Sequence, residues 1–289
     1  MDRLTIRHTT IYRYRTPVAV GEHRMMLRPR DSHDLRLIDA RLVLSPPGSV
    51  RWIHDVFGNS VAIVSFDAPA AELRIESQLE LERYALDAPS VEIDPEAADY
   101  PFAYSADDRS DLGRMLDRHY PDPGDVVGQW ARGLVQARPT PTMALLADIN
   151  AAIHSGFEYQ AREEEGTQSP MDTIACGSGT CRDFAVLLAE AARSLGIGAR
   201  IVTGYLVDRA QAPVSRGGDA THAWTELYLP GAGWIAYDPT NGTVGGADLI
   251  RVAVARAIEQ VVPIAGSFFG EAGDYAGMSV DVSSTATPA

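Results

Sequence analysis

The chain has 289 residues, of which 45% are hydrophobic and 22% charged, a composition typical of a soluble globular protein with one large domain or two modest ones. Its 39 acidic residues outweigh 25 basic ones, so neither nucleic acid nor an anionic membrane is expected as a partner. No apolar run reaches the roughly 18–20 residues that span a bilayer, and the first residues lack a signal-peptide pattern, which predicts a cytoplasmic location.

Residues 1–84 are predicted to form an antiparallel β domain. Apolar and polar side chains alternate from Leu4 to Tyr14, and short strands are expected within 35–44, 51–64 and 72–81. Residues 85–106 are rich in Asp, Ala and Pro, lack a period, and are interpreted as a linker.

The period becomes helical from Ser105, which with Asp108 fits a helix N-cap. Two further helices are expected near 124–137 and 142–155. The core is predicted to cover 107–265. In 266–289 we expect a strand at 278–282 that packs back on the β domain, followed by a disordered tail. The predicted fold class is α+β.

A glycine-rich turn leads into a helix that begins at Cys181. Apolar residues recur at helical spacing from Phe184 to Leu195, and Gly196 is a natural residue to end the helix. At a helix start, free N–H groups and the helix dipole favour a thiolate, the nucleophilic form of cysteine. The alternative is a small buried side chain. Cys176, which lacks such a position, is expected to be structural, and two cysteines suit neither a disulfide framework nor a structural zinc site.

His222 opens a predicted strand, and a turn at 231–233 returns the chain through a second strand that ends at Asp238. Antiparallel pairing would bring the Asp238 carboxylate to the imidazole, where it could fix the tautomer and favour the charged ring. Alone, either residue could be a surface His or a turn Asp before Pro239. Together with the helix-start Cys181, they match the requirements of thiol catalysis.

Several motifs carry a resemblance to a known family. They are Gly179-Thr180-Cys181-Arg182-Asp183-Phe184-Ala185, Leu195-Gly196-Ile197-Gly198-Ala199-Arg200, Gly204-Tyr205, His222-Ala223-Trp224-Thr225-Glu226, Gly233-Trp234 and Asp238-Pro239-Thr240. This set resembles the core of bacterial transglutaminase-like proteins, which are papain-like thiol enzymes with a Cys on a helix N-terminus and His and Asp on adjacent antiparallel strands. Arg28-Pro29-Arg30 and Asp55-Val56-Phe57-Gly58-Asn59 resemble motifs of the N-terminal β domain of such proteins.

The resemblance implies that Cys181 is the nucleophile, His222 the general base and acid, and Asp238 the orienting carboxylate. Tyr159 and Trp224 are candidate substrate or oxyanion residues, with core packing as the favoured alternative for Tyr159. The chain departs from the family pattern at 255–258, where Ala-Arg-Ala-Ile replaces Gly-Arg-Asp-Tyr. An acidic and an aromatic group are therefore missing, and if these groups line the cleft in relatives, substrate preference differs here.

The expected function is acyl transfer from a peptide or side-chain amide through a thioester. Water would make the enzyme a peptidase or deamidase, and an amine would make it a transglutaminase; we favour water. No cofactor or metal is expected. The alternatives are a non-catalytic peptide- or protein-binding module and a zinc site built from Cys181, His222 and Asp238. The substrate and the oligomeric state stay open.

Overall fold

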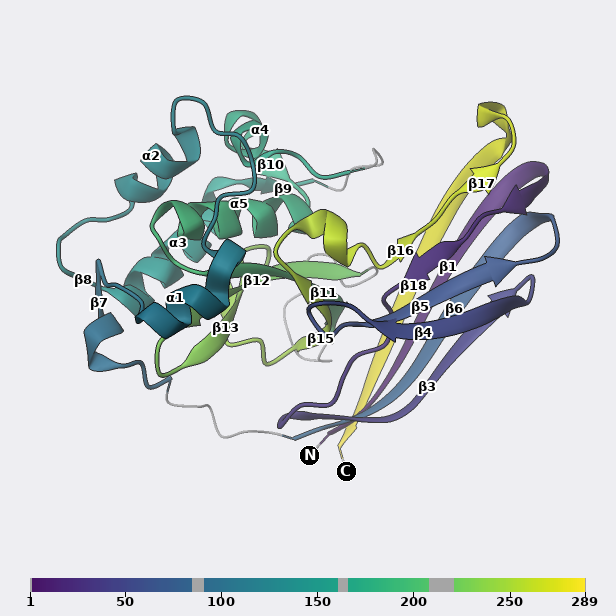
Figure 1. Cartoon of the computed structure of the whole chain (residues 1–289), viewed down its shortest axis with the longest axis horizontal. Helices are drawn as coiled ribbons and strands as arrows, with labels where there is room; N and C mark the ends of the chain where they lie inside the picture. The colour runs from purple at the N-terminus through teal and green to yellow at the C-terminus, as the bar shows by residue number, and fades with distance from the viewer. Residues whose placement is uncertain (1, 85–90, 161–165, 208–220, 289) are drawn as a thin grey trace.

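The structure, a computed structural model, describes residues 2–84, 91–160, 166–207 and 221–288. Residues 85–90 of the predicted linker and residue 289 of the predicted tail lie outside this part. The fold is α+β, as predicted, with 24% helix and 45% strand. An elongated β lobe stands beside a lobe that carries the helices (Figure 1). No helix in the described ranges has the length and apolar character required to cross a bilayer.

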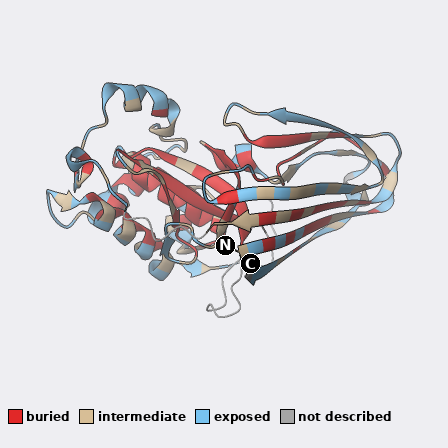
Figure 2. Ribbon diagram, turned by 90° about the horizontal axis from the view of Figure 1, so that it is seen from below, coloured by how far each residue is buried: buried red, intermediate tan, exposed pale blue. Residues whose placement is uncertain are grey.

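The β lobe contains two antiparallel sheets, ordered β17-β1-β6-β3, with β18 also paired to β1, and β16-β2-β5-β4. A buried apolar cluster between them includes Tyr14, Met25, Val64 and Leu73. Burial alternates along several of these strands, as the alternating sequence requires (Figure 2). The strands are β1 (Asp2–Val20), β2 (His23–Met25), β3 (Leu35–Ser45), β4 (Gly48–His54), β5 (Ser60–Phe66), β6 (Ala70–Arg83), β16 (Ile264–Ala265), β17 (Phe268–Phe269) and β18 (Tyr275–Pro288).

The C-terminal strand β18 confirms one prediction and corrects another. It pairs with β1 from Tyr14↔Tyr275 to Asp2↔Pro288, so the segment 278–282 does pack on the β lobe. The disordered tail expected from residue 283 is wrong, because 283–288 continue the strand. Their Ser, Thr and Ala side chains give little apolar alternation, but their backbone covers an edge of β1 that would otherwise be unpaired.

The second lobe packs helices against a five-stranded sheet ordered β14-β13-β12-β11-β15. The predicted helices near 124–137 and 142–155 are α2 and α3, and Ser105 accepts the Asp108 N–H as an N-cap. The helices are α1 (Ala106–Leu112), α2 (Val126–Gly133), α3 (Thr142–Gly156), α4 (Pro170–Cys176) and α5 (Cys181–Ser194). The strands are β11 (Ala199–Leu206), β12 (His222–Leu229), β13 (Gly233–Asp238), β14 (Thr243–Val244) and β15 (Leu249–Ala255), with short pairs β7 (Asp99–Tyr100) to β8 (Thr140–Pro141) and β9 (Glu158–Tyr159) to β10 (Ser178–Gly179). The 3-10 turns are η1 (Pro95–Ala97), η2 (Gly113–Met115), η3 (Ile258–Val261) and η4 (Ala272–Asp274).

The five-stranded sheet is covered on both faces. On one face α5 packs on β12, and Thr225 Oγ1 donates a 2.7 Å hydrogen bond to the Ala185 carbonyl. Elsewhere, residues of β11 and β15 share a buried cluster with residues of the β lobe: Leu4, Ile6, Leu35, Leu79, Leu81, Tyr205, Val207, Ile250, Val252 and Val282. Full burial of one such side chain contributes about 1.5–3 kcal/mol, so the two lobes stabilise each other. The domain boundaries at 84 and 265 stay a prediction.

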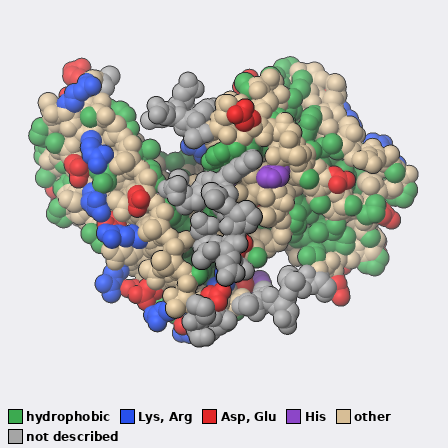
Figure 3. All heavy atoms as spheres, turned by 180° about the vertical axis from the view of Figure 1, so that it is seen from behind, with side chains coloured by type: hydrophobic (Ala, Val, Ile, Leu, Met, Phe, Trp, Pro, Cys, Tyr) green, Lys and Arg blue, Asp and Glu red, His purple; other side chains and the backbone are tan. Residues whose placement is uncertain are grey.

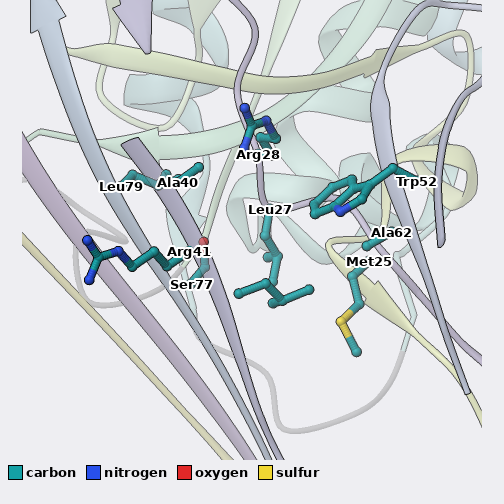
Figure 4. Close-up of a pocket in the computed structure, with 10 residues that line it drawn as sticks. Met25, Leu27, Arg28, Ala40, Arg41, Trp52, Ala62, Ser77 and Leu79 are labelled. Carbon is teal, nitrogen blue, oxygen red and sulfur yellow. The ribbon is translucent and has the colours of Figure 1, made fainter. Parts of the chain in front are cut away.

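A small cavity lies within the β lobe, between its sheets. In Figure 4 the Leu27 and Met25 side chains extend into the space between the strands, and Trp52 lies nearby. The Arg28 guanidinium carbon lies 5.9 Å from the centre of the Trp52 ring. None of the residues that line this cavity belongs to the sheet of the helical lobe, β14-β13-β12-β11-β15. On the face shown in Figure 3, basic side chains gather on the β lobe and hydrophobic ones are spread over the helical lobe.

Candidate active site

Cys181 is the first residue of α5, as predicted, and the turn before it is held by Asp183. The Thr180 N–H and Oγ1 donate to Asp183 Oδ2 at 2.7 and 2.9 Å, and the Gln168 N–H donates to Asp183 Oδ1 at 2.6 Å. A side chain at Gly179 would lie 2.9 Å from the Asp183 Cβ, so only glycine fits there. These contacts place the thiol at the positive end of the helix dipole.

The predicted pair of strands brings His222 and Asp238 together. His222 opens β12 and Asp238 closes β13, and His222 Nε2 lies 2.8 Å from Asp238 Oδ2. Both residues are buried. With Nε2 bonded to the carboxylate, Nδ1 is the ring nitrogen left for another group, and within the described ranges no residue forms a hydrogen bond with it.

The Asp238 carboxylate is fixed by two neighbours that the sequence analysis missed. The Thr240 N–H donates to Oδ1 at 2.9 Å, and Asn241 Nδ2 donates to Oδ2 at 2.8 Å. The signal was available, because an Asp followed by Pro-Thr-Asn favours a turn in which the carboxylate accepts backbone N–H groups. The turn is anchored to α3 through a 3.0 Å contact between His154 Nδ1 and the Thr240 carbonyl.

The electrostatics favour a charged Cys181–His222 pair. Burial opposes ionisation of Cys181, but the interaction with the charged His222 ring outweighs it and lowers the pKa of the thiol, helped by the Ala223 N–H. Burial likewise disfavours the imidazolium, yet the Asp238 carboxylate and the Cys181 thiolate raise the pKa of His222. The pKa of Asp238 is lowered despite its burial, because His222 and Asn241 stabilise the carboxylate.

Tyr159 and Trp224 take different positions. The Tyr159 ring meets Phe184 edge-on at 6.4 Å and packs, half-buried, against the main core cluster, as the packing alternative predicts. Trp224 is only 1% exposed and stacks on the His222 ring at 6.1 Å with an interplanar angle of 25°. Its other neighbours include Val202 and Val254, so Trp224 supports His222 instead of facing an open surface.

The expectation for Cys176 needs correction. Cys176 is exposed and not packed, because α4 ends at this residue and Gly177 turns the chain away with a φ of +66°. The segment 255–258, which departs from the family pattern, is largely buried. Ala255, Ala257 and Ile258 are buried, and the Arg256 carbonyl accepts a hydrogen bond from Arg193.

Comparison with known proteins supports the fold. Residues 4–82 match the bacterial transglutaminase-like N-terminal region, and residues 128–239 match the transglutaminase-like superfamily. The chain belongs to the transglutaminase-like superfamily. Its Cys181, His222 and Asp238 meet within a fold that belongs to a cysteine-based catalytic family. Among the described residues, no three His, Cys, Asp or Glu side chains form a metal-binding group.

Two of the similar proteins cover nearly the whole chain, and a third covers part of it. An uncharacterised protein of Mycobacterium leprae is 28% identical over 93% of this chain and 94% of its own length. A protein-glutamine gamma-glutamyltransferase of Pseudomonas aeruginosa is 31% identical over 37% of this chain, and the match spans 17% of that relative. A crystal structure from Cytophaga hutchinsonii, provisionally described as a cysteine protease, has a TM-score of 0.72 at 19% identity and covers 100% of this chain and 91% of its own.

Proposed function

We propose that this transglutaminase-like protein is a cysteine-nucleophile enzyme that transfers an acyl group from a peptide or side-chain amide. The observation that carries the proposal is the buried 2.8 Å contact between His222 and Asp238, with Cys181 as the other group that acts on the imidazole. Such an arrangement keeps the thiol ionised and the imidazole charged, which is the state required for attack on an amide.

In the first half of the proposed reaction, the Cys181 thiolate attacks the amide carbon and forms a tetrahedral oxyanion. The backbone N–H groups at the start of α5 are suited to stabilise that oxyanion. The C–N bond then breaks, the imidazolium of His222 gives its proton to the leaving nitrogen, and a thioester remains on Cys181. Asp238 keeps the imidazole in the orientation that both steps need.

In the second half, His222 accepts a proton from water as the water attacks the thioester. The C–S bond breaks, and the carboxylic acid and the Cys181 thiolate are released. An amine in place of water would give a new amide by the same steps. We propose hydrolysis as the main outcome, because water is always present at high concentration. A peptidase or deamidase is therefore favoured over a transglutaminase.

The test is mass spectrometry of a peptide library or cell lysate incubated with the intact protein, beside the Cys181→Ala variant. New peptide termini would identify a peptidase, conversion of glutamine to glutamate a deamidase, and incorporation of an added amine a transglutaminase. If the protein and Cys181→Ala give the same products, the chain is not an enzyme on amides. Retained peptide binding in that case would point to the binding-module alternative.

A further inference from the structure

A tight turn of the β lobe, Asp55–Asn59, lies between β4 and β5 and has no role in the proposed chemistry. Asp55 Oδ1 accepts the N–H groups of Phe57 and Asn59 at 3.0 and 2.9 Å. Gly58 has a φ of +77°, and Arg30 Nη1 donates to its carbonyl at 2.7 Å. All of these hydrogen bonds lie within the β lobe, so the shape of the turn does not depend on the other lobe. The turn fixes the direction of the Asn59 side chain.

Asn59 binds the edge strand of the five-stranded sheet. Its Nδ2 donates to the Val254 carbonyl at 2.8 Å, and its Oδ1 accepts the Val254 N–H at 2.9 Å. The residue is only 4% exposed. One side-chain amide thus satisfies both backbone groups that β15 would otherwise leave unpaired at this position. Val254 pairs in turn with Val202 in β11, and Val202 pairs with Trp224 in β12.

The Phe57 side chain packs beside the same residue of β15, Val254. It packs against the small buried cluster formed by Val202, Trp224 and Val254. Trp224 links this cluster to the site, because its ring is stacked on the His222 ring. A continuous set of contacts therefore runs from the turn of the β lobe to the imidazole, through one strand edge and one aromatic ring.

We propose that Asn59 and Phe57 are positioning residues, which hold Trp224 against His222 and thereby set the orientation of the imidazole toward Cys181. The inference rests on the proposed function and adds that the β lobe takes part in building the site. Without the Asn59 bonds, β15 keeps only its pairing with β11 at this place, and the Trp224 ring gains freedom. The imidazole then spends less time in the orientation that stabilises the thiolate.

The test measures alkylation of Cys181 by iodoacetamide across the pH range, in the full chain with Cys176→Ser as the parent. This readout reports the thiolate and needs no substrate. We expect Asn59→Ala to lower the alkylation rate near pH 6 by about 3–10-fold relative to the rate near pH 9, since the thiolate loses its charged partner. Phe57→Leu keeps every hydrogen bond of the turn, should shift the profile in the same direction, and serves as the test if Asn59→Ala does not fold.

Thr203→Val is the matched control. The Thr203 hydroxyl, on β11, donates a 2.8 Å hydrogen bond to the Val261 carbonyl of η3, and the residue is 4% exposed, so the variant also loses a buried hydrogen bond between the sheet and a neighbouring segment. It leaves the Trp224 cluster untouched, and its alkylation profile should match the parent at a similar loss of thermal stability. Unchanged profiles in Asn59→Ala and Phe57→Leu, or an equal shift in Thr203→Val, would overturn the inference while leaving the proposed function intact. A parent without enhanced alkylation near pH 6 would overturn both.

Discussion

His222 and Asp238 lie at the open end of one hairpin, where β12 begins and β13 ends. Their side chains are joined by a 2.8 Å contact between Nε2 and Oδ2. The antiparallel return of β13 along β12 pairs Tyr237 with Thr225, which brings Asp238 close to the start of β12, and the side chains bridge the remaining distance. The same contact leaves Nδ1 as the nitrogen for the thiol.

The pH profile of kcat/KM should be bell-shaped. The lowered pKa of Cys181 keeps the thiolate present below the ordinary thiol range, which is near 8.5. The raised pKa of His222 keeps the imidazolium above its ordinary range, which is near 6.5. Activity should therefore fall on the acid side as the thiolate is protonated, and on the basic side as His222 loses its proton. Both limbs belong to the pair and not to either residue alone.

A profile with a single limb near pH 8.5, at the position of an ordinary thiol, would show that His222 does not stabilise the thiolate. The control is His222→Ala, which should move the onset of Cys181 alkylation up toward that range. The measurement is an initial-rate series on an amide substrate found by the peptide screen.

Removal of Cys181 or His222 should have effects that do not add. Cys181→Ala and His222→Ala should each lower kcat by about 10⁴–10⁶-fold, and the double variant should be little worse, because the two groups act as one unit. Ser194→Ala, at the opposite end of α5, is the control on the same helix, and it should stay folded with far smaller losses. Losses that multiply in the double variant would mean that the two residues act independently.

Asp238→Asn should keep the fold and lower kcat by less than removal of the nucleophile. The amide can still accept the Thr240 N–H, but it no longer stabilises the imidazolium or enforces its tautomer. The pKa of Asp238 is lowered in the folded protein, so its carboxylate contributes stability above its unfolded pKa that is lost as the pH falls. The variant should therefore lose less stability on acidification than the parent does. Acid unfolding followed by circular dichroism measures this, and identical acid transitions would contradict it.

The site was predictable from sequence because each part of it is local. Gly196 stops α5, the alternation from His222 to Leu229 defines a strand, and a short turn forces Asp238 back to His222. The support of the site was less visible, because it comes from distant segments. Nothing in the spacing of Asn59 indicates that its amide binds Val254, since that contact depends on how two lobes pack.

The same limit explains the errors. Cys176 reads as a packed residue, because free cysteines are commonly buried, whereas its exposure follows from the exact end of α4. Residues 283–288 carry small polar side chains that predict disorder, whereas their order comes from the backbone of β1 at the opposite end of the chain. Pairing between the two ends of a chain is hardly visible in the local pattern of apolar and polar residues.

The last prediction concerns this terminal strand. Truncation after Val282 should lower the free energy of unfolding by roughly 1–3 kcal/mol, because several backbone hydrogen bonds are lost and one edge of β1 is exposed. The pairs that disappear include Ile6↔Ser284 and Leu4↔Ala286, and both apolar side chains belong to the cluster shared by the two lobes. Thermal unfolding should report the loss, and amide hydrogen exchange should rise first in residues 2–7.

The double substitution Thr285→Ser with Thr287→Ser is the matched control, since it changes side chains of the same segment and keeps its backbone. It should leave both the unfolding temperature and the exchange of β1 close to those of the parent. The truncated chain tests whether the pairing matters at all, because a truly disordered tail would contribute nothing to either measurement. If truncation changes neither quantity, then 283–288 do not pair with β1 in solution, and the expectation drawn from their polar side chains was correct.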